Sequence, residues 1–265
     1  MMNGEGLTVW PQVERRQKIL ELLREQRTLK SADLADRFGV NQATVRRDLQ
    51  ALAHEFGVRL VHGGATILAA GTNPVLDEVD LETKQVTNLE AKTQIARKAA
   101  ALIEDGDTIA LNAGSTVELV LDYLRPEVRS LTVLTLGLNI AWRAARLRNV
   151  SLFVAGGYYR PSTQALVGPT AIHALEQLHV DKAFLGAVAV DIEAGWTHPS
   201  HIEVETNQLL VRNARRRYLL ADSSKFGRVA FARICPLTDF DAFVVDDQFP
   251  EAIREWAATQ DITVI

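Results

Sequence analysis

The sequence predicts two folded parts: an N-terminal winged helix-turn-helix followed by a doubly wound, mostly parallel α/β domain. Residues 14–65 show helical periodicity interrupted by a glycine turn, whereas strand-length apolar runs alternate with helical patterns from Leu89 onward. A chain of 265 residues is comfortable as two domains. We therefore expect domains at 1–65 and 89–265, joined by a linker at 66–88.

Composition excludes several other classes of protein. The chain is 47% hydrophobic and 23% charged, which is ordinary for a globular protein. Its longest apolar runs have strand length, and its N-terminus lacks the basic and apolar regions of a signal peptide. The single cysteine, Cys235, allows no internal disulfide. We expect a cytoplasmic protein with no membrane partner, no cofactor and no metal.

Charge distribution indicates where a nucleic acid would bind. The net charge of −4 argues against binding by the whole surface. Residues 1–62 carry ten Lys/Arg and eight Asp/Glu, a balance of +2, whereas the remainder carries nineteen and twenty-five, a balance of −6. Any DNA-binding surface is therefore expected in the N-terminal domain.

Two short helices are expected in that domain after a first helix at residues 14–26. Ser31 has the side chain of an N-cap for the first of the two, and Leu34 and Phe38 form its apolar i, i+4 pair. Gly39 stands where the chain needs a left-handed residue to turn. Asn41 is expected to cap the next helix, whose inward face is Val45, Leu49 and Leu52.

The outward face of that last helix is suited to the major groove. Gln42 and Thr44 have side chains for base edges, and Arg46 and Arg47 suit phosphates or guanine. The turn at Gly63-Gly64 predicts a short β-wing that brings Arg59 and His62 near the DNA backbone. The predicted DNA-binding residues are Ser31, Asn41, Gln42, Thr44, Arg46, Arg47, Arg59 and His62. The alternative is an αα-hairpin whose arginines are a solvated face.

The larger domain contains seven strand-length apolar runs separated mostly by helical patterns, which predicts a parallel sheet covered on both faces. Ligands bind such sheets at the carboxyl ends of the strands. There the sequence places glycines, hydroxyls, an arginine, a lysine and an acid, Asp191. The predicted site residues are Asn112, Gly114, Ser115, Thr116, Thr135, Gly137, Gly157, Arg160, Asp191, Glu205 and Lys225.

These side chains divide by charge into two groups. Gly114, Ser115, Thr116 and Lys225 suit a phosphate dianion, because backbone amides at a helix start and a cation stabilise it. Asp191 and Glu205 suit sugar hydroxyls. Each residue taken singly is more often an ordinary loop or surface residue, so the prediction of an anionic ligand depends on their convergence.

The segments "RRQKILELL", "ATVRRDLQAL" and "VRLVHGGA" together resemble the winged helix-turn-helix of the DeoR family of bacterial transcriptional regulators. The segments "GDTIALNAGST", "DKAFLGAVAVD" and "ARRRYLLADSSKFGR" resemble the sensor domain of the same family, which is similar in fold to ribose-5-phosphate isomerase. The resemblance implies a regulator, usually a repressor, that binds double-stranded operator DNA and responds to a phosphorylated sugar or related metabolite. It covers nearly all of residues 14–265.

Four positions depart from the family pattern. Asn112 replaces a common Asp, Leu136 a common Asn, and Asn207 stands near a common Lys, while Ala189 replaces a Gly. Asn112 donates and accepts hydrogen bonds but cannot act as a base. These changes leave the expected phosphate loop intact and alter the side of the site that faces the sugar.

Two other functions compete with the regulator hypothesis. A sugar-phosphate isomerase needs a carboxylate base, for which Glu205 is the candidate, but the lysine is missing and the DNA-binding part would be unexplained. Alternatively, the larger domain only assembles subunits. Whether the larger domain senses a ligand or only assembles subunits, we expect the regulator to be a homo-oligomer, either a dimer or a tetramer. Two DNA-binding domains on a symmetric operator combine their affinities. The sequence leaves open the effector, the operator and whether the effector releases DNA.

Overall fold

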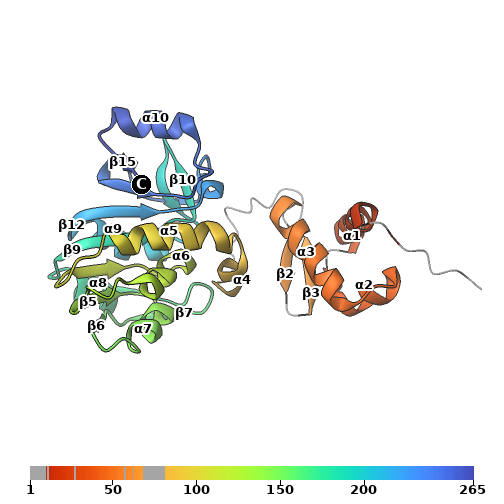
Figure 1. Ribbon diagram of the computed structural model, residues 1–265, viewed down its shortest axis with the longest axis horizontal. Helices are drawn as coiled ribbons and strands as arrows, with labels where there is room; N and C mark the ends of the chain where they lie inside the picture. The colour runs from red at the N-terminus through yellow and green to blue at the C-terminus, as the bar shows by residue number, and fades with distance from the viewer. Residues whose placement is uncertain (1–9, 11, 27, 57, 62, 68–80) are drawn as a thin grey trace, which may run out of the picture. The chain divides into compact units, whose positions relative to one another are not determined.

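The computed structural model describes residues 10, 12–26, 28–56, 58–61, 63–67 and 81–265. Its contacts divide the chain into two compact units, residues 1–74 and 75–265, which we call the N-terminal and C-terminal units (Figure 1). The undescribed residues 68–80 fall within the predicted linker, whose first two residues, Thr66 and Ile67, belong instead to a strand of the N-terminal unit.

Three helices form the N-terminal unit: α1 (Gln12–Gln26), α2 (Ser31–Phe38) and α3 (Gln42–Phe56). The apolar residues predicted to face inward are buried, and they share one core with Val58 and Ala65. Gly39 ends α2 in the left-handed conformation at φ 63°, as predicted. The helix-turn-helix is therefore confirmed.

The wing is a hairpin of two antiparallel strands, β2 (Val58–Val61) and β3 (Gly64–Ile67). A strand that the sequence did not predict, β1 (Thr28–Lys30), pairs with β3 and completes a sheet of order β1-β3-β2. A Cβ on Gly64 would lie 2.0 Å from the carbonyl oxygen of Leu29, so this close pairing needs glycine.

The C-terminal unit is built on a seven-stranded sheet whose pairs are all parallel. Its strands follow the order β15-β14-β12-β9-β4-β5-β6. Every one corresponds to a predicted apolar run: β4 (Thr108–Leu111), β5 (Leu131–Thr135), β6 (Val150–Val154), β9 (Val180–Gly186), β12 (Ala214–Leu220), β14 (Ala242–Val244) and β15 (Thr263–Val264). The predicted doubly wound α/β fold is confirmed.

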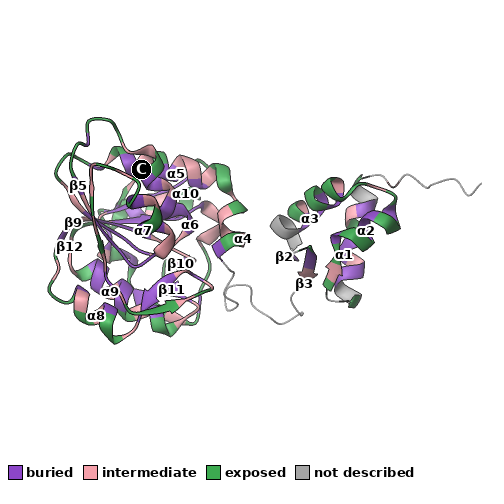
Figure 2. Ribbon diagram, turned by 90° about the horizontal axis from the view of Figure 1, so that it is seen from below, coloured by how far each residue is buried: buried purple, intermediate pink, exposed green. Residues whose placement is uncertain are grey.

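Helices cover both faces of this sheet, so that its central strands are buried and the outer sides of the helices are exposed (Figure 2). One core cluster includes residues of α5 (Leu89–Ala101), η1 (Leu119–Tyr123) and α7 (Leu138–Ala144). The other includes residues of α8 (Pro169–Leu175), α9 (Val204–Arg212) and α10 (Glu251–Thr259). Cys235 belongs to the second cluster, and burial raises the pKa of its thiol to about 12.

Shorter elements, few of them predicted, connect the strands and helices of this unit. They are α4 (Leu81–Val86), α6 (Ser115–Glu118), the hairpin β7 (Tyr158–Arg160) and β8 (Ala165–Val167), the antiparallel β10 (Ala189–Asp191), β11 (Gly195–His198) and β13 (Ala232–Cys235), and the 3-10 turns η2 (His201–Glu203), η3 (Ser223–Lys225) and η4 (Leu237–Asp239). Within the described chain, no helix combines the length and apolar character needed to cross a bilayer.

Candidate functional site

The exposed face of α3 carries the residues predicted to contact DNA. Gln42, Arg46 and Arg47 are exposed, and Thr44 is half-buried. Asn41 caps the helix, because its Oδ1 accepts a hydrogen bond from the backbone N of Thr44 at 2.8 Å. The face therefore combines two amides, a hydroxyl and two guanidinium groups on one rigid helix.

Ser31 is not the N-cap that the sequence analysis expected. Lys30 occupies the N-cap position of α2, no side chain caps this helix, and Ser31 is only 5% exposed. The backbone N of Ser31 instead donates to the carbonyl of Gly63 at 2.7 Å, because β1 runs directly into α2 beside the wing. Arg59 lies in β2, whereas His62 lies outside the described residues.

A buried ion cluster that the sequence analysis missed joins α1 to α3. Asp48 is 1% exposed, and its carboxylate accepts hydrogen bonds from Nε of Arg15 at 2.6 Å and Nε of Arg16 at 2.9 Å. Arg15 also donates to the carbonyl of Trp10. Asp48 directly follows Arg46 and Arg47, so the cluster fixes the buried side of the helix whose other side presents those arginines.

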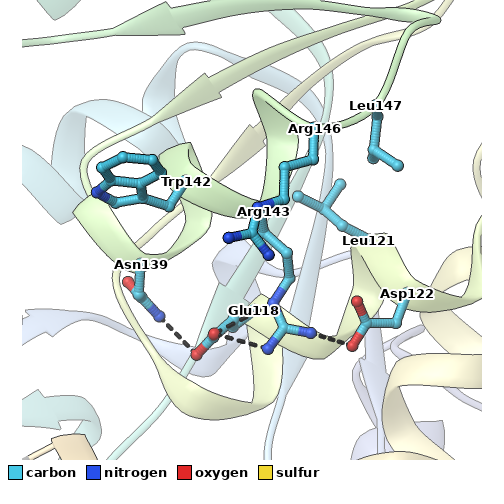
Figure 3. A pocket seen from close by; sticks show the side chains of 8 residues that line it. All are labelled: Glu118, Leu121, Asp122, Asn139, Trp142, Arg143, Arg146 and Leu147. Atoms are coloured by element: carbon cyan, nitrogen blue, oxygen red, sulfur yellow. Dashed lines mark hydrogen bonds and ion pairs between the residues drawn. The ribbon is translucent and has the colours of Figure 1, made fainter.

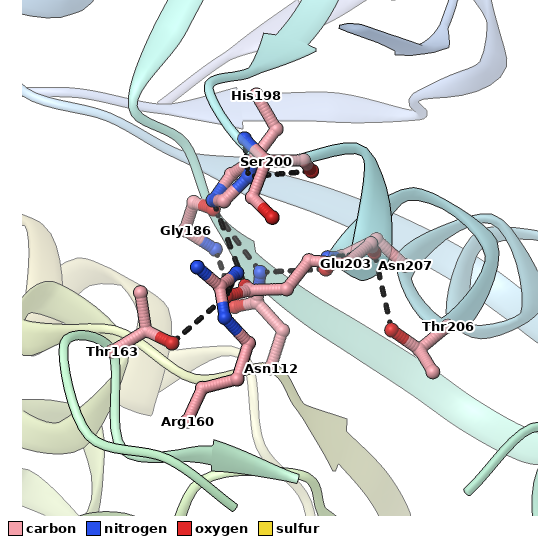
Figure 4. Close-up of polar contacts among 9 residues, drawn as sticks. All are labelled: Asn112, Arg160, Thr163, Gly186, His198, Ser200, Glu203, Thr206 and Asn207. Carbon is pink, nitrogen blue, oxygen red and sulfur yellow. Dashed lines mark hydrogen bonds and ion pairs between the residues drawn. The ribbon is translucent and has the colours of Figure 1, made fainter. Parts of the chain in front are cut away.

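In the C-terminal unit, Asn112 links the carboxyl ends of β4 and β9 to helix α9 (Figure 4). Its Oδ1 accepts from the backbone N of Gly186 at 2.8 Å, and its Nδ2 donates to the carbonyl of Gly186 and to Oδ1 of Asn207. Asn207 in turn donates to the carbonyl of Glu203 at 2.7 Å. The uncharged side-chain amides of Asn112 and Asn207 thus form a hydrogen-bonded group at the carboxyl edge of the sheet, which we call the amide network.

Glu203, rather than the predicted Glu205, is the carboxylate of this network. Glu203 is 5% exposed, and its Oε1 accepts from Arg160 Nη1 and Thr163 Oγ1, both at 2.8 Å. Nε2 of His198 lies 3.6 Å from Oε2 of Glu203. Glu205 is exposed on α9, because the helix turns it away from the strand ends. Within the described residues Glu205 is therefore not part of this network, and its role as the sugar-facing acid stays a prediction.

The Gly-Ser-Thr loop follows β4, with Gly114 as the N-cap of α6 and Ser115 and Thr116 in its first turn. Both side chains are largely buried, and neither hydroxyl makes a hydrogen bond among the described residues. A Cβ on Gly114 would meet nothing within 4 Å, so the space beside this loop is open.

Lys225 follows β12, which β9 separates from β4 in the sheet. Nζ of Lys225 lies 3.7 Å from Oδ2 of Asp222, a buried atom with no hydrogen bond among the described residues. Lys92 of α5 is 3% exposed, and burial, followed by the charge of Lys225, lowers its pKa to about 8. Burial alone would raise the pKa of Asp222, but Lys225, Ser224, Asn88 and Lys92 together lower it.

Four other predicted residues have structural uses. The Thr135 hydroxyl is fully buried and donates to the carbonyl of Leu111, while it accepts from the backbone N of Gly137. Gly157 adopts φ 115° and approaches the carbonyl of Val167. One carboxylate oxygen of Asp191 accepts from two backbone N–H groups of the β10–β11 turn. No described contact brings these residues to the amide network.

A separate pocket of about 420 Å³ lies beside α6, η1 and α7 (Figure 3). Eight residues line it: Glu118, Leu121, Asp122, Asn139, Trp142, Arg143, Arg146 and Leu147. It contains none of the predicted ligand residues.

Leu136, one of the departures from the family pattern, is buried in the core. Among the described residues, no group of three His, Cys, Asp or Glu side chains is arranged to hold a metal ion.

Two protein-family models match the chain. The DeoR-like helix-turn-helix domain matches residues 15–70, and the DeoR C terminal sensor domain matches residues 87–247. The two matches cover both compact units.

Relatives match over nearly their whole length. The uncharacterized HTH-type transcriptional regulator FruR of Bacillus subtilis (strain 168) is 33% identical, with 88% of this chain and 90% of the relative covered. The HTH-type transcriptional regulator GlpR of Haloferax volcanii is 32% identical, with 95% and 96% covered. The glycerol-3-phosphate regulon repressor of Escherichia coli (strain K12) is 28% identical, with 92% and 94% covered.

Likeness to solved structures is weaker. Ribose 5-phosphate isomerase A of Methanocaldococcus jannaschii has 21% identity and a TM-score of 0.39, with 52% of this chain and 55% of that chain covered. This degree of likeness supports no conclusion about chemistry.

Proposed function

The chain belongs to the DeoR family of transcriptional regulators, and from this premise we propose that it represses genes of carbohydrate metabolism and senses a phosphorylated sugar. The observation that carries the proposal is that Lys225 and the hydroxyls of Ser115 and Thr116 follow the carboxyl ends of β12 and β4, two parallel strands on either side of β9. As a regulator of operator DNA, it acts in the cytoplasm.

On the N-terminal unit, α3 is the element that enters the major groove. Arg46 and Arg47 are exposed and contact phosphates or guanine, while Gln42 and Thr44 contact base edges. One such helix offers few base contacts, so a homo-oligomer presents two of them to a symmetric operator. Arg59 of β2 and the predicted His62 add contacts to the DNA backbone.

On the C-terminal unit, the phosphate binds between the Gly-Ser-Thr loop and Lys225. Amides and hydroxyls of residues 114–116 supply donors, and Lys225, which is 24% exposed, supplies a reachable cation. Lys92 adds positive charge, which the sequence analysis did not assign to the site. The charges of Lys92 and Lys225 act on each other, and the carboxylate of Asp222 acts on both. This local positive charge favours the binding of a dianion.

The sugar faces the amide network and the Arg160–Glu203 pair. Asn112 and Asn207 are neutral, so the site offers hydrogen bonds without a base at those positions. Glu203 is held by Arg160 and Thr163. A general base needs an accessible lone pair, whereas the carboxylate of Glu203 is 5% exposed and already accepts hydrogen bonds from Arg160 and Thr163. These features disfavour an isomerase.

A thermal-shift screen tests the effector site. Glycerol 3-phosphate, fructose 1-phosphate, glucose 6-phosphate, their unphosphorylated parents and inorganic phosphate are compared on the full chain. A compound that binds the folded chain raises its Tm. Stabilisation by a sugar phosphate but not by its parent is expected, whereas no stabilisation by any phosphorylated compound would favour a domain that only assembles subunits.

A further inference from the structure

We propose that residues 81–92, which we call the strap, transmit occupancy of the phosphate site to the N-terminal unit. The strap comprises α4, residues 87–88 and the first turn of α5. It is the first described segment of the C-terminal unit after residue 67, and therefore the part of that unit that the linker reaches first. The inference rests on the proposed function, because it concerns regulation through the same site.

The strap is held at three points along its length. The backbone N of Leu81 donates to the carbonyl of Ser162 at 2.9 Å. Nε2 of Gln85 donates to Oε2 of Glu118 at 2.8 Å. Nδ2 of Asn88 donates to Oδ1 of Asp222 at 3.1 Å and to Oγ of Ser224 at 3.3 Å.

Each of these partners is close in sequence to a proposed ligand residue. Ser162 lies two residues after Arg160, and Ser224 directly precedes Lys225. Glu118 ends the short helix that begins with Ser115. Since a ligand that draws these loops together also moves the three partners, the strap cannot keep all of its hydrogen bonds unless it moves with them.

Glu118 is a fixed junction rather than a flexible side chain. It is 6% exposed, and its carboxylate also accepts from Asn139 Nδ2 at 2.8 Å and from Nε and Nη2 of Arg143 (Figure 3). A displacement of α6 is therefore passed to Gln85 through a carboxylate that has no freedom to absorb it.

The joint between α4 and α5 is suited to a change of angle. Asn88 has φ 51°, a conformation that few residues other than glycine adopt. Nζ of Lys92 donates to the carbonyls of Lys84 and Thr87, and so holds the end of α4. A phosphate near Lys225 attracts the same ammonium, so binding competes with its hold on α4.

The experiment separates ligand binding from coupling. Full-length wild type and the double variant Gln85→Ala/Asn88→Gly are compared on a DNA fragment selected from a random pool by the wild-type chain. Glycine at 88 removes the side-chain donor and tolerates the positive φ. Gln94→Ala is the matched control, because Gln94 is a half-buried residue of α5 beyond the strap. The probes are the sugar phosphates of the thermal-shift screen and inorganic phosphate.

In the wild type and the control, an active probe is expected to raise the Tm and to change DNA affinity about tenfold. In the double variant the rise in Tm persists, while the affinity ratio with and without probe falls to about one. An unchanged ratio would overturn the strap's role, as would loss of the Tm rise, which would make Gln85 and Asn88 ligand contacts. A wild type that responds to no probe would overturn the proposed function and the coupling with it.

Discussion

Each unit buries a charged side chain, but different kinds of neighbouring groups surround the two charges. Asp48 in the N-terminal unit contacts two arginines. Lys92 in the C-terminal unit contacts carbonyl oxygens and lies in the field of a second lysine. A buried charge with close partners of opposite sign stabilises one arrangement, whereas a buried cation beside another cation is stabilised further by an added anion. The difference separates a fixed recognition surface from a site suited to a ligand.

The largest effect is expected at Asp48. Asp48→Ala leaves the guanidinium groups of Arg15 and Arg16 without their carboxylate, so the N-terminal unit should lose about 3 kcal/mol of stability. Hydrogen exchange of the backbone amides of α1, α2 and α3 in increasing denaturant measures it, because the other three tryptophans lie in the C-terminal unit and would obscure the fluorescence of Trp10. Asp36→Ala, at an exposed position of α2, is the control and should change stability by less than about 0.5 kcal/mol. Equal effects of the two substitutions would contradict the fixed-surface interpretation.

The pH dependence of the free energy of unfolding tests the second buried charge, that of Lys92 in the C-terminal unit. The pKa of Lys92 is lowered from 10.5 to about 8 in the folded chain. Between these values the unfolded chain binds a proton that the folded chain does not, so the free energy of unfolding should rise with pH in this window. We expect wild type to gain about 2 kcal/mol relative to Lys92→Met between pH 8 and 10.5. Parallel pH profiles for the two proteins would show that Lys92 stays charged.

Arg47→Ala should weaken binding to the selected DNA about tenfold to a hundredfold, because it removes one exposed guanidinium from the recognition helix. The same variant should keep the rise in Tm caused by an active sugar phosphate. Arg212→Ala, an exposed arginine at the end of α9, serves as the control. Fluorescence anisotropy with labelled DNA measures both, and normal DNA binding by Arg47→Ala would mean that α3 presents a different face.

Lys225→Ala should have the opposite pattern: the affinity for a sugar phosphate falls about tenfold, while DNA affinity without it is unchanged. Lys98→Ala is matched to it, since Lys98 is a partly exposed lysine of α5 bonded to the carbonyl of Val245. Calorimetric titration measures the affinity. If both variants bind the sugar phosphate as the wild type does, the phosphate lies elsewhere.

The recognition helix could be predicted from the sequence because its exposed and buried faces follow one local period. The parallel sheet could be predicted because each strand contains or overlaps a short apolar run. In both cases the information lies within ten to fifteen neighbouring residues.

The polar contacts at the proposed strand-end site were predicted less well because distant parts of the chain set their geometry. Glu203 and Glu205 are two residues apart, and only the point where η2 passes into α9 decides which one faces Arg160. Lys92 sits in an amphipathic helix, where a lysine is ordinarily solvated, and it is buried because α4 packs over it. Ser31 has the side chain of an N-cap, but the unpredicted strand β1 places Lys30 there.

The most direct test of the switch between the two units is the affinity of the full-length chain for its selected DNA, titrated with a sugar phosphate that raises the Tm. The account predicts a shift of about tenfold that saturates at the concentration where the thermal shift saturates, since one binding event drives both. A DNA affinity that stays constant while the sugar phosphate fills its site would contradict the account, because the C-terminal unit would then bind its ligand without controlling the recognition helix.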